Sequence, residues 1–424
     1  MRISGAEAEA IARGLTGDLP EPRVATHRRF NDASGDAIDS GLVLYFPAPG
    51  SFTGETVVEL HGHGGPVVVA LVIDAAVKLG ARIAEPGEFT KRAFLNDKLD
   101  LAQAEAVADL IGSGTEQAAR AALRSLTGVF SELVAQVATE VERLRLYVEA
   151  AIDFPEEEAD FLSDAQLQTA IEQTAESFAQ LIAQARVGRV LRDGYRVVIV
   201  GKPNAGKSSL LNRLSGEETA IVTEVAGTTR DILREQINID GLAVELVDTA
   251  GLRNDPDRIE AEGIRRAREA LQSADAVLWI QDATDGEQTE INEELPDDIP
   301  IIVVRNKVDL TDEHVGADDD DDKLIRLSAK AGDGLDALRT QIRRLAGYRD
   351  LGEQTVTARR RHVDAMKRSR EHFEAGRRAL AEQHAGELFA EELRLAHQAL
   401  GEVTGTTSSD DLLGMIFTEF CIGK

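Results

Sequence analysis

Residues 196–209 read RVVIVGKPNAGKSS, and this stretch decides the fold of the chain around it. Val197 to Val200 form a short apolar run of the kind found in buried strands. The run leads into Gly201-Lys-Pro-Asn-Ala-Gly-Lys207-Ser208, where glycines at both ends let the backbone wrap around an anion. Lys207 can reach the outer phosphates of a nucleotide, and the Ser208 hydroxyl can bind Mg²⁺. A helix-forming stretch begins at Ser209, so the pattern predicts a strand, a phosphate-binding loop and a helix.

Three further motifs follow in the order that a nucleotide site requires. Asp248-Thr-Ala-Gly251 comes after an apolar run; its carboxylate would hold Mg²⁺ through water, and the Gly251 N–H would meet the terminal phosphate. In Asn306-Lys-Val-Asp309, the last carboxylate can accept two hydrogen bonds from guanine, whereas adenine offers no matching donors. Ser328-Ala-Lys330 is expected to support the base through backbone N–H groups. Each short motif alone is common in loops, but the ordered set indicates a GTP site.

The residues from Thr223 to Asp231 occupy the expected position of a switch segment, with a threonine hydroxyl available for Mg²⁺. Leu252 follows the Asp248–Gly251 motif, so no glutamine stands there to orient the attacking water. An arginine finger can accelerate hydrolysis by about 10³ to 10⁵, and either Arg230 or a partner can supply one. A bound monovalent cation is the alternative, and Asn204 offers it a neutral oxygen ligand.

The composition excludes several classes of protein. A chain of 424 residues predicts two to four domains, and we expect it to be soluble and cytoplasmic because it has no signal-peptide pattern and no apolar run near the length of a membrane span. The single cysteine, Cys421, excludes a disulfide framework and a multi-cysteine metal site. A net charge of -28 argues against a general nucleic-acid platform, so any RNA contact must be local or shared with a partner.

Secondary-structure signals divide the chain into four segments. Residues 1–97 predict a small α+β domain with strands at 41–46, 56–60 and 82–85 and a helix at 66–79. Residues 98–193 predict the first half of a helical domain. The chain is helical from about Leu99 to Ala151 and broken only near Gly112 and Gly114, and residues 153–158 form a polar link. A capping box of Ser163 and Gln166 then starts a helix that runs to about Arg192.

Residues 194–349 alternate strands and helices and predict a doubly wound α/β sheet. Runs at 232–239 and 242–247 flank Asp240-Gly241, which predicts an antiparallel hairpin at one edge, and runs at 276–280 and 301–304 indicate buried strands. Residues 350–424 are helical again. The expected architecture is therefore multidomain α/β plus α, with the sheet domain inserted within a discontinuous helical domain.

The ordered GTP motifs combine with several other stretches into a family pattern. These stretches are residues 86–96 (PGEFTKRAFLN), 98–105 (KLDLAQAE), 147–155 (YVEAAIDFP) and the terminal Phe420-Cys-Ile-Gly-Lys424. Over nearly its whole length the chain resembles the tRNA modification GTPase family MnmE, also called TrmE. The resemblance implies a Ras-like P-loop GTPase domain and a homodimer whose GTPase domains pair across K⁺. It also implies an N-terminal domain that binds a folate one-carbon donor, 5-formyl- or 5,10-methylene-tetrahydrofolate. With the FAD-dependent partner MnmG, such a protein adds a carboxymethylaminomethyl or aminomethyl group at C5 of the wobble uridine of certain tRNAs.

The resemblance also assigns residues to each site. K⁺ would be bound by Asn204, Thr223, Val225 and Thr228, and Mg²⁺ by Ser208 and Thr229. The GTP-binding residues would be Asn204, Ala205, Gly206, Lys207, Ser208, Ser209, Thr223, Glu224, Val225, Ala226, Gly227, Thr228, Thr229, Asp248, Thr249, Ala250, Gly251, Asn306, Lys307, Asp309, Ser328, Ala329 and Lys330. Folate would be held by Arg2, Glu59, Lys98 and Lys424. Glu260 would position the attacking water, and Cys421 would take part in the modification chemistry.

Several of these assignments have a plainer alternative. Glu260 without the family match is a solvated glutamate at a helix start, with Glu262 close by, and Cys421 beside Phe420 and Ile422 is equally a small buried apolar residue. His61 and His63 lack a third ligand nearby and are expected in a loop rather than at a metal.

Two wider alternatives concern the whole chain. Members of the family carry a strand and a glycine-rich turn before the Arg-Ile-Ser-Gly that begins here at Arg2, so we expect either a start codon assigned too far downstream or a missing edge strand, with a weakened Arg2 contact. The functional alternative is a regulatory RNA-binding GTPase of the ribosome-assembly type, which would use residues 359–361 and 367–370. It leaves the folate positions and the terminal Cys-Ile-Gly-Lys unexplained.

Overall fold

The structure is a computed structural model, and it describes residues 1–153, 165–217, 234–248, 270–271, 273–285, 299–318, 321, 323–348, 355–407 and 416. The chain divides into two compact units. Unit 1 comprises residues 1–108, 125–171 and 368–424, and unit 2 comprises residues 109–124 and 172–367. None of the helices in the described ranges combines the length and apolarity that a membrane crossing requires.

Unit 1 begins with a four-stranded antiparallel sheet covered by helices. Its elements are β1 (Arg2–Ser4), α1 (Ala8–Thr16), β2 (Thr26–Asn31), β3 (Ala37–Phe46), β4 (Val57–His61), α2 (Pro66–Lys78) and α3 (Glu88–Leu95). The strand order is β1-β4-β3-β2, which places β1 at an edge. Leu15 of α1, Phe30 and Val58 of the strands and Val72 of α2 share one buried cluster, because alternate strand residues point to the helix side of the sheet.

The predicted strand at 82–85 is wrong, because these residues form no strand. Arg82 donates from both terminal guanidinium nitrogens to the Glu88 carboxylate, at 2.8 and 2.5 Å, and the Glu85 N–H donates to the same carboxylate at 2.9 Å. The polar groups of this segment are therefore directed to the first turn of α3 rather than to a neighbouring strand.

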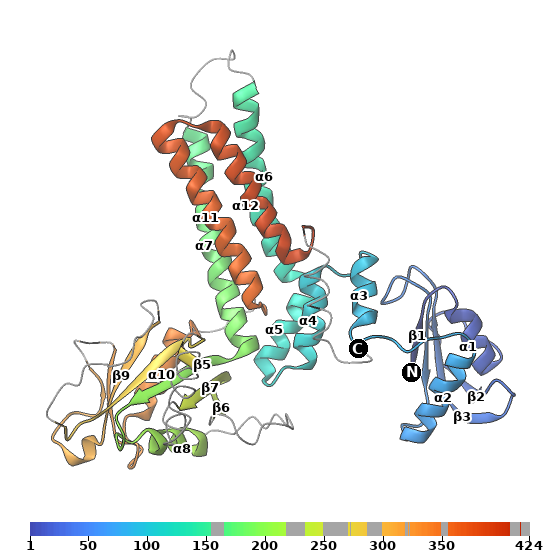
Figure 1. Cartoon of the computed structure of the whole chain (residues 1–424), viewed down its shortest axis with the longest axis horizontal. Coiled ribbons are helices and arrows are strands. Elements are labelled where there is room, and N and C mark those ends of the chain that lie inside the picture. The colour runs from blue at the N-terminus through green and yellow to red at the C-terminus, as the bar shows by residue number, and fades with distance from the viewer. Residues whose placement is uncertain are drawn as a thin grey trace, which may run out of the picture. The chain divides into compact units, whose positions relative to one another are not determined.

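The rest of unit 1 is helical. It contains most of α4 (Leu101–Ile111), all of α6 (Val129–Asp153) and α12 (Gly386–Thr404), and parts of α7 (Ala165–Asp193) and α11 (Arg360–Gln383). Helix α12 packs along α6 (Figure 1). It also lies close to α11, where Ser369 Oγ donates to the Ala396 carbonyl at 2.7 Å.

The predicted helical region has one more break than expected. Besides the interruption at 112–115, the chain breaks at Gly128, whose φ of 97° separates α5 (Glu116–Leu126) from α6. A side chain there would be strained, so this glycine ends the helical run. Ser163 of the predicted capping box lies outside the described residues.

Unit 2 contains the predicted doubly wound sheet. Its elements are β5 (Tyr195–Gly201), α8 (Lys207–Glu217), β6 (Arg234–Ile239), β7 (Leu242–Asp248), β8 (Ala276–Asp282), β9 (Ile301–Asn306), the 3₁₀ helix η3 (Val308–Leu310), β10 (Gly316–Ala317), β11 (Leu324–Leu327) and α10 (Leu335–Leu345). The strand order is β10-β11-β9-β8-β5-β7-β6, with parallel pairing from β11 through to β7 and antiparallel pairing at both edges.

These observations confirm the fold class and the hairpin at Asp240-Gly241, which joins β6 to β7. Helices α5, α7, α8 and α10 each contribute buried side chains to the core of this sheet, among them Ala121, Val190, Leu210 and Leu338. The boundaries of the four segments proposed from the sequence stay predictions.

Candidate functional site

The phosphate-binding loop spans the turn from β5 to α8, at the edge where the parallel strands end. At this edge Gly201 ends β5, Asp282 ends β8 and Asn306 ends β9. Doubly wound sheets bind their ligands at the carboxyl ends of their strands, because the loops that follow these strands converge there.

Two glycines of this loop are required by close packing. Gly201 has a φ of 152° and Gly206 a φ of 95°, in the region that favours glycine. A Cβ at Gly206 would lie 2.1 Å from Asn306 Nδ2, and a Cβ at Gly201 would lie 2.3 Å from the Ile280 carbonyl oxygen. The loop therefore approaches its neighbours more closely than any side chain allows.

The polar residues of the loop are arranged around the start of α8. Lys207 Nζ donates to the carbonyls of Gly201 and Lys202 at 2.7 and 2.8 Å, so its amino group lies over the loop. Ser208 and Ser209 are exposed in the first turn of the helix, where N–H groups and the helix dipole favour an anion. Asn204 is exposed at the loop tip with a left-handed φ of 66°.

Asn306 joins the phosphate-binding loop to the loop after β11. Its side chain is 2% exposed, Nδ2 donates to the Ala205 carbonyl at 2.9 Å, and Oδ1 accepts from the Ala329 N–H at 2.9 Å. From the sequence this residue was expected only to contact the nucleotide. In the structure its side chain fixes the distance between the loop predicted to hold the phosphates and the loop predicted to hold the base.

Asp309, the residue predicted to read guanine, is oriented by a hydroxyl. Ser328 Oγ donates to Asp309 Oδ1 at 2.7 Å and accepts from the Ala331 N–H at 3.1 Å. This side-chain contact leaves the second carboxylate oxygen of Asp309 available for another donor. The sequence placed Ser328 and Lys330 near the base only through their backbone.

Lys307 lies in the left-handed region with a φ of 69°, and its Nζ is 2.5 Å from Asp282 Oδ2. Burial works to raise the pKa of Asp282, but hydrogen bonds from Lys307 and Thr284 outweigh it and hold the pKa below its usual value. Asp282 therefore stays ionised and fixes the Lys307 side chain at the end of β8, a role that the sequence motifs did not reveal.

The other predicted nucleotide residues lie wholly or partly outside the described structure. Asp248 ends β7 opposite Ile199 of β5, and only its backbone is described. The residues outside the described ranges are Thr223, Glu224, Val225, Ala226, Gly227, Thr228, Thr229, Thr249, Ala250, Gly251 and Glu260, together with Cys421 and Lys424 at the end of the chain.

The N-terminal sheet brings together two of the four predicted folate residues. Arg2 and Glu59 face each other in the β1–β4 register, and Arg2 Nε donates to Glu59 Oε1 at 2.8 Å. Burial works to raise the pKa of Glu59, but Arg2 and His61 outweigh it, so the pKa lies below its usual value and the carboxylate stays charged. Arg2 lies in the edge strand β1, which pairs with β4, and its contact with folate stays a prediction.

Two aromatic rings flank Arg2 and were not singled out from the sequence. The guanidinium carbon lies 5.6 Å from the centroid of Phe52 and 5.5 Å from that of Phe89, within cation–π range. Lys98 lies in the turn after α3, where its N–H donates to the Ala93 carbonyl at 2.8 Å and its side chain runs beside Gly54.

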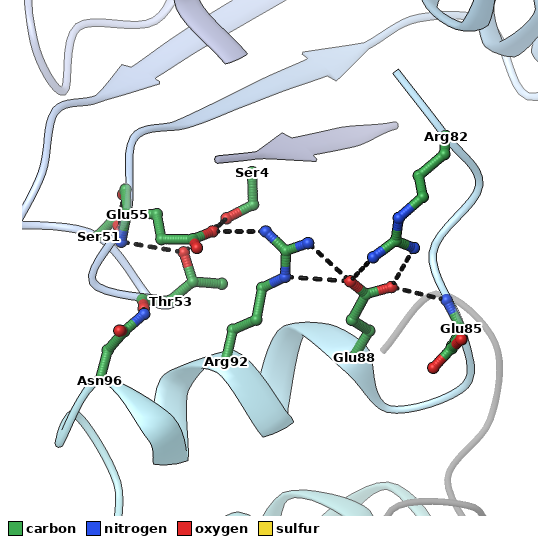
Figure 2. Close-up of polar contacts among 9 residues, drawn as sticks. All are labelled: Ser4, Ser51, Thr53, Glu55, Arg82, Glu85, Glu88, Arg92 and Asn96. Atoms are coloured by element: carbon green, nitrogen blue, oxygen red, sulfur yellow. Dashed lines mark hydrogen bonds and ion pairs between the residues drawn. The ribbon is translucent and has the colours of Figure 1, made fainter. Parts of the chain in front are cut away.

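A network of ion pairs fixes this region (Figure 2). Arg92 of α3 contacts Glu88 at 2.7 Å and Glu55 at 2.8 Å, and Glu55 in turn accepts from Ser4 Oγ of β1 at 2.8 Å. The hydrogen bond from Arg82 is the main reason that the pKa of Glu88 falls to about 2. The sequence feature that indicates the Glu88–Arg92 pair is the stretch at 86–96, whose glutamate and arginine stand four residues apart on one helix face.

A cavity of about 530 Å³ opens beside this network. Its lining includes Arg2, Val69, Ile73, Phe89 and Arg92, so apolar side chains of α2 face guanidinium groups. A site of this volume, with few polar groups on an apolar wall, is typical of small-molecule pockets.

His61 and His63 each contact a carboxylate. His61 Nε2 lies 3.1 Å from Glu59 Oε2, and His63 Nδ1 lies 2.8 Å from Asp39 Oδ1. His61 ends β4 and His63 follows it in a loop.

Comparisons with known proteins agree with the motifs. The family model described as "GTP-binding protein TrmE N-terminus" matches residues 1–98, and the model "MnmE helical domain" matches residues 101–421. Proteins named tRNA modification GTPase MnmE are similar over 100% of this chain. The one from Erwinia tasmaniensis is 52% identical with 95% of its own length covered, and the one from Alkalilimnicola ehrlichii is 55% identical with 96% covered.

Solved structures are more distant. The G domain of the T. maritima FeoB iron transporter is 22% identical, covering 36% of this chain and 98% of that chain, with a TM-score of 0.26. A GTP-binding protein from Sulfolobus solfataricus in complex with GDP is 19% identical, covering 54% and 71%, with a TM-score of 0.27. Likenesses at these scores carry no argument about this chain. The two family models and the identity across the full length do, and they show that the chain belongs to the MnmE (TrmE) family of tRNA modification GTPases.

Proposed function

We propose that this chain is a K⁺-dependent GTPase that modifies C5 of the wobble uridine of certain tRNAs with a folate one-carbon donor and the flavoprotein MnmG. The observation that carries the GTP part is the arrangement at the carboxyl edge of the sheet. There Ser328 orients Asp309 at 2.7 Å, while Asn306 holds the base loop and the phosphate loop together.

The geometry fits a guanine nucleotide with Mg²⁺. The two glycines let the loop backbone pack against Ile280 and Asn306, and Ser208 stands in the first helical turn, where its hydroxyl can reach the metal. Adenine would leave the Asp309 carboxylate without donors, at a cost of about 1–3 kcal/mol or more for a charged group. The site therefore selects GTP over ATP.

The K⁺ part rests on Asn204 and on the Leu252 that replaces a water-orienting glutamine. Asn204 offers a neutral amide oxygen at the exposed loop tip, which suits a monovalent cation. Thr223, Val225 and Thr228 complete the proposed set of ligands.

Replacing K⁺ by Na⁺ tests this account. We expect GTP turnover and pairing of the GTPase domains to fall at least about tenfold, since positive charge at the phosphates is worth several powers of ten in rate. Asn204→Ala should show a low rate in both salts. Equal rates for the wild type in K⁺ and Na⁺ would reject the cation.

Glu260 is proposed to position the attacking water, and Glu260→Gln isolates that role. The variant should lose hydrolysis by about 10² or more while its affinity for GTP analogues stays within about twofold. Glu262→Gln is the matched control, since it stands two residues away. A parallel loss of nucleotide affinity in Glu260→Gln would indicate a structural role instead.

The folate part rests on the Arg2–Glu59 pair and the rings around it. An ionised carboxylate suits the paired N–H donors of a pterin edge, aromatic faces suit its ring, and Lys98 and Lys424 suit the glutamate tail. The homodimer proposal is supported by exposed apolar side chains in the same domain, including Val67 at 71% and Ile83 at 70% exposure.

Titration with 5-formyl-tetrahydrofolate tests the folate site. Glu59→Gln should weaken binding at least about tenfold, since a charged hydrogen-bond acceptor is lost. Glu9→Gln is the control, because Glu9 in the same domain also pairs with an arginine, Arg13. Equal affinity of the wild type and Glu59→Gln would reject the proposed pterin contact.

A further inference from the structure

The β6–β7 hairpin stands between the two segments that are predicted to sense the nucleotide. The segment from Thr223 to Asp231 precedes β6 in the sequence, and the segment Asp248–Gly251 begins at the last residue of β7. In the described sheet β6 is the outermost strand and pairs with β7 alone. An edge hairpin can shift without displacing the buried parallel strands, so it is suited to transmit movement of either segment.

The tip of this hairpin is held by side chains from two other elements. The Tyr348 hydroxyl donates to Gln117 Oε1 of α5 and lies 3.3 Å from the Asp240 carbonyl oxygen. Gly241, with a φ of 91°, fits beneath them, since a Cβ there would lie 2.4 Å from Gln117 Oε1 and 2.7 Å from Tyr348 Oη. Arg343 of α10 adds an ion pair to Asp240 at 2.9 Å and lies over the Tyr348 ring. We call Gln117, Asp240, Gly241 and Tyr348 the tip latch.

Helix α5 runs from this latch to the segment that leads into α11. Arg124 at the other end of α5 donates to the Thr355 carbonyl at 2.7 Å, and Ala121 between them is buried in the sheet core. A movement of the hairpin tip would therefore displace α5, which is packed on the sheet. Through Arg124, α5 contacts the segment by which the chain leaves the sheet.

Asp109 ties the same segment to the point where the chain enters the sheet. Its Oδ1 accepts from Arg192 Nε, near the end of α7, and from Arg359 Nη2, just before α11, each at 2.8 Å. Asp109 is 6% and Arg359 9% exposed in their side chains, so this pair is shielded from solvent, whereas the Arg192 side chain is 30% exposed. Breaking one partner of such a cluster is costly, and the entry and exit of the sheet therefore move together.

We propose that the tip latch is an allosteric coupling element: the β6–β7 hairpin takes different positions with GDP and GTP, and the latch passes this difference through α5 to the helices that enter and leave the sheet. The proposal rests on the proposed GTP site. Because coupling is reciprocal, a change at the latch must alter the relative affinities for the two nucleotides.

Tyr348→Phe in the full-length protein tests this, because it removes the hydroxyl and keeps the ring. We measure the affinities for GDP and for a non-hydrolysable GTP analogue, and the amide hydrogen exchange of α5 in each state. The expected result is a change of at least about threefold in the ratio of the two affinities, at the low end of measured couplings. The nucleotide-dependent difference in exchange at 116–126 should disappear.

Tyr45→Phe is the matched control, because it removes a tyrosine hydroxyl that donates to Glu9 at 3.0 Å in unit 1, and its affinity ratio should stay unchanged. Gln117→Ala should reproduce the shift, and the double variant should add little to it, since both act on one contact. Gln117→Ala also carries the test if Tyr348→Phe fails to fold.

Two results would overturn the proposed coupling through the tip latch and leave the GTP site intact. One is an equal fall in the affinities for both nucleotides in the latch variants. The other is a ratio of the two affinities equal to that of the wild type. Failure of the wild type to bind guanine nucleotides would overturn the proposed function itself.

Discussion

At the scale of single residues, the proposed recognition of the base by Asp309 depends on how firmly its carboxylate is held. Ser328 donates to it at 2.7 Å from a side chain that is 1% exposed. We predict that Ser328→Ala lowers the affinity for GDP and GTP about fivefold to tenfold, since a hydrogen bond to a charged group is worth about 1.5–3 kcal/mol and part is recovered by water. Titration with fluorescent nucleotides measures these affinities. Thr340→Ala, which removes a hydroxyl bonded to the Asp336 carbonyl in α10, should leave the affinity unchanged. Equal affinities for Ser328→Ala and the wild type would contradict the orienting role.

Glu88 gives the N-terminal domain a predictable acid response. Its pKa in the folded protein is about 2, because it accepts hydrogen bonds from Arg82, the Glu85 N–H and Arg92. A depressed carboxylate pKa stabilises the fold at neutral pH, and that contribution is lost as the pH falls from about 4.5, the unfolded value, through about 2. Thermal unfolding between pH 7 and pH 2 measures this loss of stability. Glu88→Gln should lower the free energy of unfolding at pH 7 by about 2 kcal/mol and reduce the loss of stability between about pH 4.5 and about pH 2. The same acid-induced loss in the variant and the wild type would contradict the role given to Glu88.

Other residue roles emerged only from the folded chain. Sequence motifs predicted Asn306 and Asp309 as site residues, and the family resemblance assigned Arg2 and Glu59. The structure pairs Arg2 with Glu59 and gives Asn306 and Asp309 hydrogen-bond partners in the loop after β11. It could not predict that Asp282 holds Lys307 or that Phe52 and Phe89 flank Arg2. These contacts join residues far apart in the chain, and no local pattern encodes which loop meets which strand end.

At the scale of elements, the phosphate-binding loop depends on close approach of its backbone. Gly206→Ala would place a Cβ 2.1 Å from Asn306 Nδ2, so it should abolish nucleotide binding and cost about 2 kcal/mol or more. Gly216→Ala in α8 is the matched control, because nothing lies within 4 Å of its Cβ position, and it should stabilise the helix by about 0.5–1 kcal/mol. Titration with GDP and thermal unfolding separate the two variants. Nucleotide binding by Gly206→Ala at the affinity of the wild type would contradict the packing argument.

The elements with local signals were predicted correctly. The strand, loop and helix around Gly201 and the hairpin at Asp240-Gly241 formed as expected, because glycine positions and apolar runs specify them within a few residues. The strand at 82–85 failed because Glu88 captures the polar groups of that segment, and the break at Gly128 was missed within an otherwise helical composition. In the first case a nearby contact overrode the pattern, and in the second a left-handed glycine did.

At the scale of the whole molecule, the chain combines a GTPase sheet with a helical region and a small N-terminal sheet domain. The order of helical, sheet and helical segments predicted the insertion, and the fold class is confirmed. Sequence patterns could not divide the chain into its two compact units, because residues 109–124 belong with the sheet unit while their neighbours on both sides belong to the other. That division depends on packing between distant helices.

The central claim, that this GTPase modifies the wobble uridine, is tested most directly by mass spectrometry of tRNA nucleosides from a strain that lacks the gene. The account predicts that the modified uridine disappears and returns with the wild-type gene. Complementation with Gly206→Ala should fail, whereas Gly216→Ala should restore the modification. Unchanged wobble uridines in the deletion strain would contradict the account.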